Sequence, residues 1–180
     1  MALSATNVRV GTTGAIYSGA TTASAPTSAT SSLTSFTELG YVHSDGVTET
    51  RDRSTSQIRA WQNSDLIREV VTESTATFQF VLLETNKAVI EAFYGSTVDS
   101  ASGGIEINPN ATGGKKSFVI DLVDGADVIR TYIPVGEILS VGDVVYQNGE
   151  AVGYDVTVTA YTDSVKGYAF KKWISALKTS

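Results

Sequence analysis

The 180-residue sequence contains no cysteine, one histidine and 3 prolines, and each scarcity excludes a class of protein. Without cysteine the chain forms no disulfide framework, thiolate zinc site, iron–sulfur cluster or thiol nucleophile. Its one histidine, His43, cannot build a multi-histidine metal site. The length, the few prolines and the lack of a hydrophilic hinge indicate one domain.

Basic residues and long apolar runs are also scarce. The chain has 13 Lys+Arg against 19 Asp+Glu, a net charge of −6. Tight nucleic-acid binding requires a basic surface that replaces phosphate counterions, so this balance disfavours a nucleic-acid binder of the usual kind. The longest apolar runs, such as residues 80–83, are too short to span a bilayer. Residues 1–9 also lack the pattern of a secretory signal.

From Val47 onward, β-type side chains alternate with polar ones between Gly, Asp and Asn turns. Residues 77–84 predict a strand whose apolar face carries Phe78, Phe80 and Leu82. Residues 117–124 and 128–133 flank a turn and predict a hairpin. These patterns indicate antiparallel β-structure.

A second hairpin is predicted around Asn148-Gly149, because Asn-Gly is the strongest short hairpin signal. Its strands would be residues 144–146 and 154–161. In the later strand, alternation places one set of side chains in the core and the other outside. The inward set is Tyr154, Val156, Val158 and Ala160, and the outward set is Asp155, Thr157 and Thr159.

One segment, residues 86–94, predicts a helix, with Thr85 as its N-cap and Gly95 as its stop. Val89 and Phe93 are four residues apart and are expected to face the sheet together. A second short helix is predicted over Tyr168 to Leu177. The expected architecture is therefore mainly antiparallel β, with one helix packed on the sheet.

The N-terminal region has an unusual composition. No charged residue lies between Arg9 and Glu38, and twelve of the twenty residues from Ser18 to Thr37 are Ser or Thr. Such a segment cannot form a core of its own. Two interpretations stay open: a flexible surface loop, or an arm that becomes ordered against another subunit.

No group of residues predicts catalysis or cofactor binding. Residues 113–117 lack the glycine spacing and the Ser or Thr of a phosphate loop. Asp121, Asp124 and Asp127 are spaced in threes, unlike the ligands of a calcium loop. His43 has no nucleophile-elbow pattern around it. We therefore expect neither an enzyme nor a cofactor.

The stretch from Val47 to Trp61 concentrates arginines between acids and ends on a tryptophan. One interpretation is a solvated hairpin. The other is a protein interface, because guanidinium groups pair bidentately and indoles bury a large area. Long strands also need their edges covered or paired. A head-to-tail ring of identical subunits achieves this, and stacked rings form a tube.

Three blocks of the sequence, in this order, carry a family resemblance. The first runs over residues 39–54 and into 57–63, the second comprises residues 78–80 and 84–86, and the third comprises residues 153–163 and 171–173. Over nearly the whole chain, the sequence resembles the major tail tube proteins of long-tailed, non-contractile phages, in the form found in phages of actinobacteria. The blocks are sequence signatures rather than catalytic motifs, so their specificity comes from their number and order.

The resemblance implies a mainly β fold, an antiparallel β-sandwich or barrel with one flanking α-helix, a long N-terminal arm and inter-subunit loops. It divides the chain into an arm at residues 1–37 and a tail tube domain at residues 38–180, with its helix near 86–94. It implies hexameric rings stacked into a tube for DNA ejection. The arm and residues 47–61 would reach neighbouring subunits or the next ring.

The resemblance also implies partners and a location. The chain would contact further copies of itself, a tape measure protein, a tail terminator and distal tail or baseplate proteins. DNA would pass through the lumen without specific binding, and no membrane would be involved. The protein would assemble in the host cytoplasm and reside in the virion tail.

Roles for individual residues follow as expectations from the same resemblance. Candidate inter-subunit contacts are Arg51, Arg53, Arg59 and Trp61. Candidate lumen or outer-surface positions are Thr77, Gln79, Asp155, Thr157 and Thr159, and the sequence does not distinguish these two surfaces. An acidic lining repels phosphates, so we expect negative charge to be concentrated on the lumen face.

Three alternatives remain at this stage. A secretion-system-type ring or tube protein would assemble in the same way but pass a protein. A monomeric β-sandwich adhesin or virion decoration module would present an apolar or aromatic ligand patch and stay monomeric. An enzyme would need a pocket with perturbed acids, which the sequence does not indicate.

Overall fold

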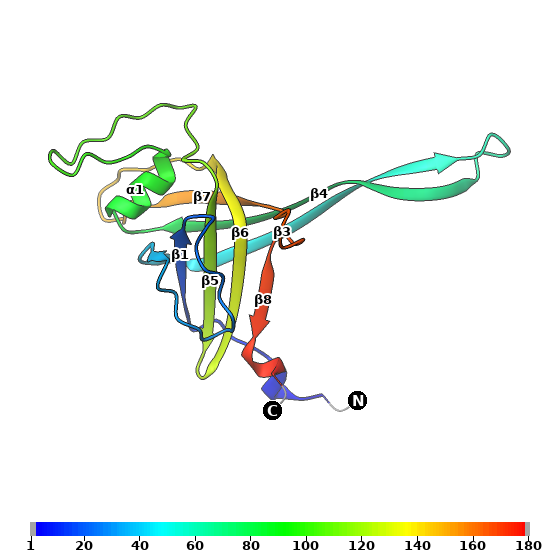
Figure 1. The fold of residues 1–180 in the computed structure, drawn as a ribbon, viewed down its shortest axis with the longest axis horizontal. Helices are drawn as coiled ribbons and strands as arrows, with labels where there is room; N and C mark the ends of the chain where they lie inside the picture. Colours follow the sequence, from blue (N-terminus) through cyan, green and yellow to red (C-terminus); the bar gives the residue numbers. More distant parts are fainter. Residues whose placement is uncertain (1–2, 179–180) are drawn as a thin grey trace.

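The computed structural model describes residues 3–178, whose strands form one eight-stranded antiparallel sheet in the order β2-β1-β5-β6-β7-β4-β3, with β8 paired to β6 (Figure 1). The strands are β1 Thr13–Gly19, β2 Thr37–Glu38, β3 Val42–Arg59, β4 Leu66–Leu82, β5 Lys116–Asp124, β6 Asp127–Val141, β7 Tyr154–Tyr161 and β8 Lys171–Ile174. One α-helix, α1 Lys87–Tyr94, and two short 3-10 turns, Ala5–Asn7 and Ser175–Leu177, complete the described chain.

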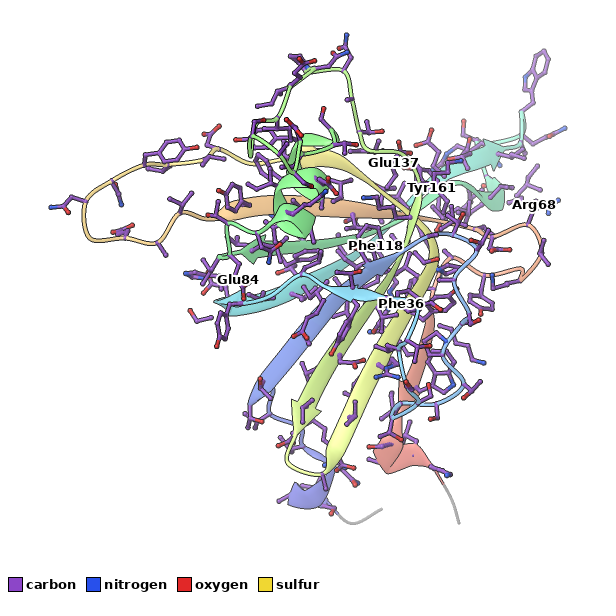
Figure 2. The ribbon with its side chains drawn as sticks, turned by 60° about the vertical axis from the view of Figure 1, so that its left-hand side comes forward. Phe36, Arg68, Glu84, Phe118, Glu137 and Tyr161 are labelled. Atoms are coloured by element: carbon purple, nitrogen blue, oxygen red, sulfur yellow. The ribbon has the colours of Figure 1, made fainter. Side chains whose placement is uncertain are left out.

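Strand β6 belongs to two half-sheets. Its residues 127–133 and Gly136 pair with β5. On its other edge, residues 129–132 pair with β8 and residues 135–141 pair with β7. The first half-sheet comprises β2, β1, β5, β8 and the start of β6, and the second comprises the end of β6, β7, β4 and β3. Figure 2 shows the two sets of strands crossing at a wide angle. The fold is thus the mainly β fold with one flanking helix that the sequence predicts.

The core lies between the two half-sheets. Phe78, Phe80 and Leu82 of β4 are buried, as the alternation of residues 77–84 predicts. The four inward residues predicted for β7 are also buried. Ile16 and Phe118 reach the same core from the first half-sheet. Because each fully buried large side chain contributes roughly 1.5–3 kcal/mol, this shared core fixes the position of one half-sheet on the other.

Helix α1 confirms the predicted helix, but its N-cap is Asn86 rather than Thr85. The Asn86 Oδ1 accepts a hydrogen bond from the Val89 amide at 2.9 Å, whereas the Thr85 hydroxyl lies 3.2 Å from the Tyr154 hydroxyl. Gly95 ends the helix at φ +66°, in the left-handed region. Val89 and Phe93 are buried together, as predicted, and the Phe93 ring meets that of Tyr154 at 5.3 Å.

Replacing Asn86 by alanine is expected to lower the free energy of unfolding by about 1 kcal/mol, because the Val89 amide loses its cap. Asn86→Ser is the matched control, since serine caps helices as well as asparagine. Urea denaturation of both variants measures the difference. Equal losses in the two variants would contradict the assignment of this cap.

Two predicted elements are wrong. The second helix is instead the strand β8 followed by a single 3-10 turn, because residues 171–174 pair with the side of β6 that β5 leaves open. Its Trp173 lies opposite Arg130 and packs its ring 6.4 Å from that of Tyr132. The Asn148-Gly149 hairpin is also absent from the described residues. Residues 142–153 form a loop, because β6 extends to Val141 and itself supplies the pairing partner of β7.

The Ser/Thr-rich region folds onto the chain's own sheet. Residues 13–19 form β1, which pairs with β5, and residues 20–36, here called the strap, lie across the outer face of the first half-sheet. The ring of Phe36 meets that of Tyr132 edge-on at 6.4 Å. Composition predicts neither this strand nor this packing, because few strap side chains are apolar.

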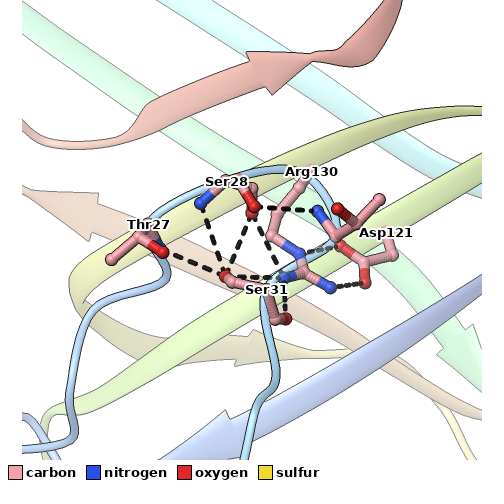
Figure 3. Close-up of polar contacts among 6 residues, drawn as sticks. Thr27, Ser28, Ser31, Asp121 and Arg130 are labelled. Atoms are coloured by element: carbon pink, nitrogen blue, oxygen red, sulfur yellow. Dashed lines mark hydrogen bonds and ion pairs between the residues drawn. The ribbon is translucent and has the colours of Figure 1, made fainter.

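The strap is held by a buried ion pair. Arg130 donates from Nε and Nη2 to the two carboxylate oxygens of Asp121 at 2.7 and 2.6 Å (Figure 3). Its Nη1 donates to the backbone carbonyl of Ser31 at 2.6 Å and to that of Ser28 at 3.3 Å. One guanidinium therefore joins β5, β6 and the strap.

Candidate assembly and lumen surfaces

The outer side of the second half-sheet is a continuous polar surface, here called the threonine face. Cross-strand pairs set its membership, because residues directly opposite each other share a face. Thr77 lies opposite Thr159, and Gln79 lies opposite Thr157. The members are Thr48, Thr50, Asp52, Thr75, Thr77, Gln79, Val81, Glu137, Asp155, Thr157 and Thr159. The structure therefore brings all five lumen or outer-surface candidates onto one face.

The charge of the threonine face is negative. Its members include Asp52, Glu137 and Asp155, and no lysine or arginine is among them. Asp155 accepts hydrogen bonds from the Gln79 amide nitrogen at 3.0 and 3.2 Å. The regular strands hold the acids in fixed positions, as required for a surface that repels phosphate.

Glu137 and Tyr161 lie together where β6 and β7 pair, at the edge of this face (Figure 2). The Tyr161 hydroxyl donates to Glu137 at 3.4 Å, and the Thr112 hydroxyl donates to the other oxygen of the same carboxylate. Burial, and then the charge of Glu137, raise the pKa of Tyr161, so this phenol stays neutral near pH 7. The Lys115 ammonium lies 5.0 Å from the centre of the Tyr161 ring.

A long hairpin of β3 and β4 extends from the second half-sheet to one end of the molecule (Figure 1). The stretch from Val47 to Trp61 forms one strand of this hairpin and the start of its turn. Its tip, residues 58–68, carries Trp61 at 98% exposure, with Ile67 at 67% and Leu66 at 50%. An isolated two-stranded ribbon is marginally stable in water. Exposed apolar side chains on such a ribbon are typical of a surface that another protein covers.

The arginine candidates have different environments. Arg51 and Arg53 lie on the side of the hairpin opposite to the threonine face, because Arg51 pairs with the buried Ala76. Arg51 Nε is 3.7 Å from a Glu49 oxygen. Arg59 instead fastens the tip, donating to the Ser64 carbonyl at 3.1 Å and to the Gln57 side chain at 2.7 Å.

A cleft of about 810 Å³ lies between β1 and the start of β3. Its lining includes the apolar Ile16, Val47 and Leu122, several glycines, and the acids Glu38, Glu84 and Asp121. Sequence reasoning missed this cleft, because its two walls are far apart in the sequence. It also missed Leu66 and Ile67 at the tip, since an apolar pair in a β-type segment normally indicates a buried strand.

The acidic side chains of the described residues are not arranged as metal ligands. Within residues 3–178, no three His, Cys, Asp or Glu side chains are grouped as metal ligands. Asp121 is bound by Arg130, and Asp127 by Arg9 at 3.0 Å, which accounts for two of the three regularly spaced aspartates. In the same residues, no helix is long and apolar enough to cross a membrane.

Solved structures with a similar fold include chains of two tube-containing assemblies. One match is to a chain of the extracellular contractile injection system PVC sheath–tube complex in its extended state, with a TM-score of 0.53, 8% identity, and coverage of 97% of this chain and 99% of that one. Another is to the tube-terminating cap of the anti-feeding prophage, with a TM-score of 0.51, 10% identity, and coverage of 97% and 100%. At these identities, the similarity shows the fold alone.

Sequence comparison identifies the family. No curated protein sequence matches the chain. The family described as "Phage tail tube protein" matches residues 1–179, which is almost the entire chain. This match agrees with the resemblance of the three sequence blocks to tail tube proteins. The chain therefore belongs to the phage tail tube protein family, as a non-enzymatic structural component of the virion tail.

Proposed function

We propose that this protein forms hexameric rings that stack into the tail tube of a long-tailed, non-contractile phage, of the kind found in phages of actinobacteria, and that DNA is ejected through the lumen. The observation that carries the proposal is the threonine face. It is mostly polar and acidic, and its members include no basic side chain. A DNA conduit requires these properties, because phosphates that find no cationic partner slide without being retained.

In this arrangement, the threonine face lines the lumen and the opposite side of the hairpin faces other subunits. Arg51, Arg53 and Trp61 are then inter-subunit contacts, while Arg59 keeps the tip in shape for its contact. The N-terminal arm at residues 1–37 contributes further contacts at its start. A tape measure protein fills the tube before ejection, and terminator and distal tail proteins close its ends. Assembly takes place in the host cytoplasm.

Electron microscopy of the purified protein tests the assembly. Six-fold rings or open tubes are expected, in which the threonine face lines the channel. Monomers that persist at every concentration would overturn the proposal and favour a monomeric adhesin or decoration module. Tubes whose channel is lined by another face would refute the assignment of the lumen.

A second candidate is the tube of an injection or secretion system that passes a protein. The fold shared with a contractile injection complex favours it. The two candidates differ in their cargo. Purified virions that contain this chain around a DNA path support the proposal, and tubes that occur without a capsid support the alternative.

Reversing the charge at Asp155 is expected to slow DNA ejection at least severalfold. Asp155→Lys places one ammonium per subunit on the threonine face, and the symmetry of a ring multiplies it around the channel. The measurement is the rate at which triggered phage release DNA to a fluorescent dye.

The matched control is Asp143→Lys, which makes the same charge change in the exposed loop at residues 142–153. It is expected to eject at the wild-type rate. Raising the salt concentration should restore part of the Asp155→Lys rate, because screening weakens phosphate attraction. Equal rates for both variants would place Asp155 away from the DNA path.

A further inference from the structure

The tip of the hairpin exposes apolar side chains that nothing in the single chain covers. Trp61 is 98% exposed at the far end of a two-stranded ribbon, and Leu66 and Ile67 lie exposed on the returning strand. The backbone of the turn is nevertheless held by hydrogen bonds. The Ala60 amide donates to the Asp65 carbonyl at 2.8 Å, and the Arg59 side chain donates to the Ser64 carbonyl. A preorganised aromatic residue of this kind is the usual anchor of a protein interface.

The cleft between β1 and the start of β3 is a matching concavity. It has a volume of about 810 Å³, and the apolar Ile16, Val47 and Leu122 contribute to its lining. Gly46 in its wall has no other group within 4 Å of where a Cβ would lie, so this wall leaves open space. Tyr41, which is 77% exposed, stands beside it and offers an aromatic surface to an incoming ring.

The two surfaces cannot meet within one chain. Val47 in the cleft and Trp61 at the tip are 14 positions apart, and the extended strand β3 covers this stretch as far as Arg59. At about 3.3 Å per residue, this separation is about 45 Å. Figure 1 shows the hairpin tip at one end of the long axis, far from β1. Any contact between tip and cleft therefore joins different copies.

Charge also matches the tip to the cleft. The cleft is lined by Glu38, Glu84 and the already paired Asp121, and no lysine or arginine is among its lining residues. The tip carries Arg59 and Arg68 against one acid, Asp65. Within residues 3–178, Arg68 makes no ion pair, so its charge is available to a partner.

We propose that Trp61 of one copy docks in the β1–β3 cleft of a second copy, with Arg68 facing the acids of that cleft. The proposal rests on the proposed function, since it specifies a contact between subunits of the tube. The contact is head-to-tail, because each copy offers a tip at one end and a cleft elsewhere. Such a contact leaves a free tip and a free cleft at the ends of every oligomer, so it repeats until a ring closes or a filament grows.

Thiol cross-linking in assembled tubes tests whether the tip of one copy contacts the cleft of another. Because the native sequence has no cysteine, only the introduced thiols can react. The double variant Ser44→Cys with Gln62→Cys places one thiol at the cleft and one at the tip, both at exposed residues. A bismaleimide is expected to convert it into a ladder of covalent oligomers. Each single-cysteine variant should give at most dimers.

A control pair, Ser44→Cys with Val8→Cys, tests whether the N-terminal segment of a second copy, rather than its hairpin tip, occupies the cleft. A ladder with this pair and none with Ser44→Cys and Gln62→Cys would overturn the proposal. So would tubes of normal appearance that yield no ladder from either pair. If wild-type protein forms no rings or tubes, the proposed function itself fails, and microscopy shows this before any cross-linking.

Hydrogen exchange of the unaltered protein gives a second measurement that needs no variant. In tubes, compared with dissociated subunits, we expect slower amide exchange both at residues 58–68 and at residues 11–16 and 40–47. These are the tip and the two walls of the cleft. Protection of the tip without protection of the cleft would show that Trp61 docks elsewhere.

Discussion

Replacing Asp121 by alanine is expected to lower the free energy of unfolding by about 3–5 kcal/mol, because it leaves the Arg130 guanidinium buried without its counter-charge. The Arg130 and Asp121 side chains are only 7% and 10% exposed, so water replaces little of the lost pairing. Urea denaturation measures the loss. The variant should also release the strap, which makes the bonds after Leu33 and Phe36 more sensitive to chymotrypsin.

Asp127→Ala is the matched control, because Asp127 also pairs with an arginine near the same turn but is 37% exposed. Asp127→Ala is expected to lower the free energy of unfolding by about 1 kcal/mol or less. If Asp121→Ala were no more destabilising than Asp127→Ala, the buried pair would not be what holds the strap. A double variant, Asp121→Leu with Arg130→Met, should recover part of the stability, since it removes both charges together.

Replacing Trp61 by alanine is expected to raise the protein concentration needed for tube assembly by about thirtyfold. An interface anchor contributes about 2 kcal/mol, and each 1.4 kcal/mol corresponds to a factor of ten. The free energy of unfolding of the monomer should change by less than about 0.5 kcal/mol, because the side chain is 98% exposed. Sedimentation of tubes across a concentration series measures the first quantity, and urea denaturation the second.

Val165→Ala is the control for removing an exposed apolar group, because Val165 is 92% exposed and lies in the loop between β7 and β8 rather than at the hairpin tip. It should assemble at the wild-type concentration. Normal assembly of Trp61→Ala would mean that the hairpin tip makes no important contact. A large loss of monomer stability in this variant would mean that Trp61 supports the fold of the hairpin instead.

Local sequence patterns predicted the strands and the helix that are buried on one face only. Alternation in residues 77–84 and 154–161 identified two central strands with the correct inward side chains, because a strand buried on one face keeps a strict period of two. Capping signals located α1 to within one residue. The failures were β8 and the Asn148-Gly149 hairpin, where the pairing partner, β6, is chosen by long-range packing.

The candidate surfaces were predictable only in part. The charged, β-type sequence from Val47 to Trp61 left a solvated hairpin and an interface as two open interpretations, and the structure shows this stretch as one strand of a longer hairpin with β4. The five polar candidates could be named, but their joining with Thr48, Thr50 and Glu137 into one face depends on the strand order. The strap could not be predicted, since its attachment depends on Arg130, a hundred residues further along the chain.

Strand β6 has a mechanical consequence for a tail that bends. Among the described residues, it pairs with strands of both half-sheets, so it is one route by which a force on the hairpin reaches the rest of the subunit. The other route is the chain itself, which runs from the strap through β2 into β3. At the junction of the two half-sheets in β6, a Cβ on Gly136 would come within 2.9 Å of Phe118 and Val158, so little space exists for the halves to rock. In the proposed tube, we therefore expect little movement between the two half-sheets at this junction, and we expect curvature to arise mainly between subunits.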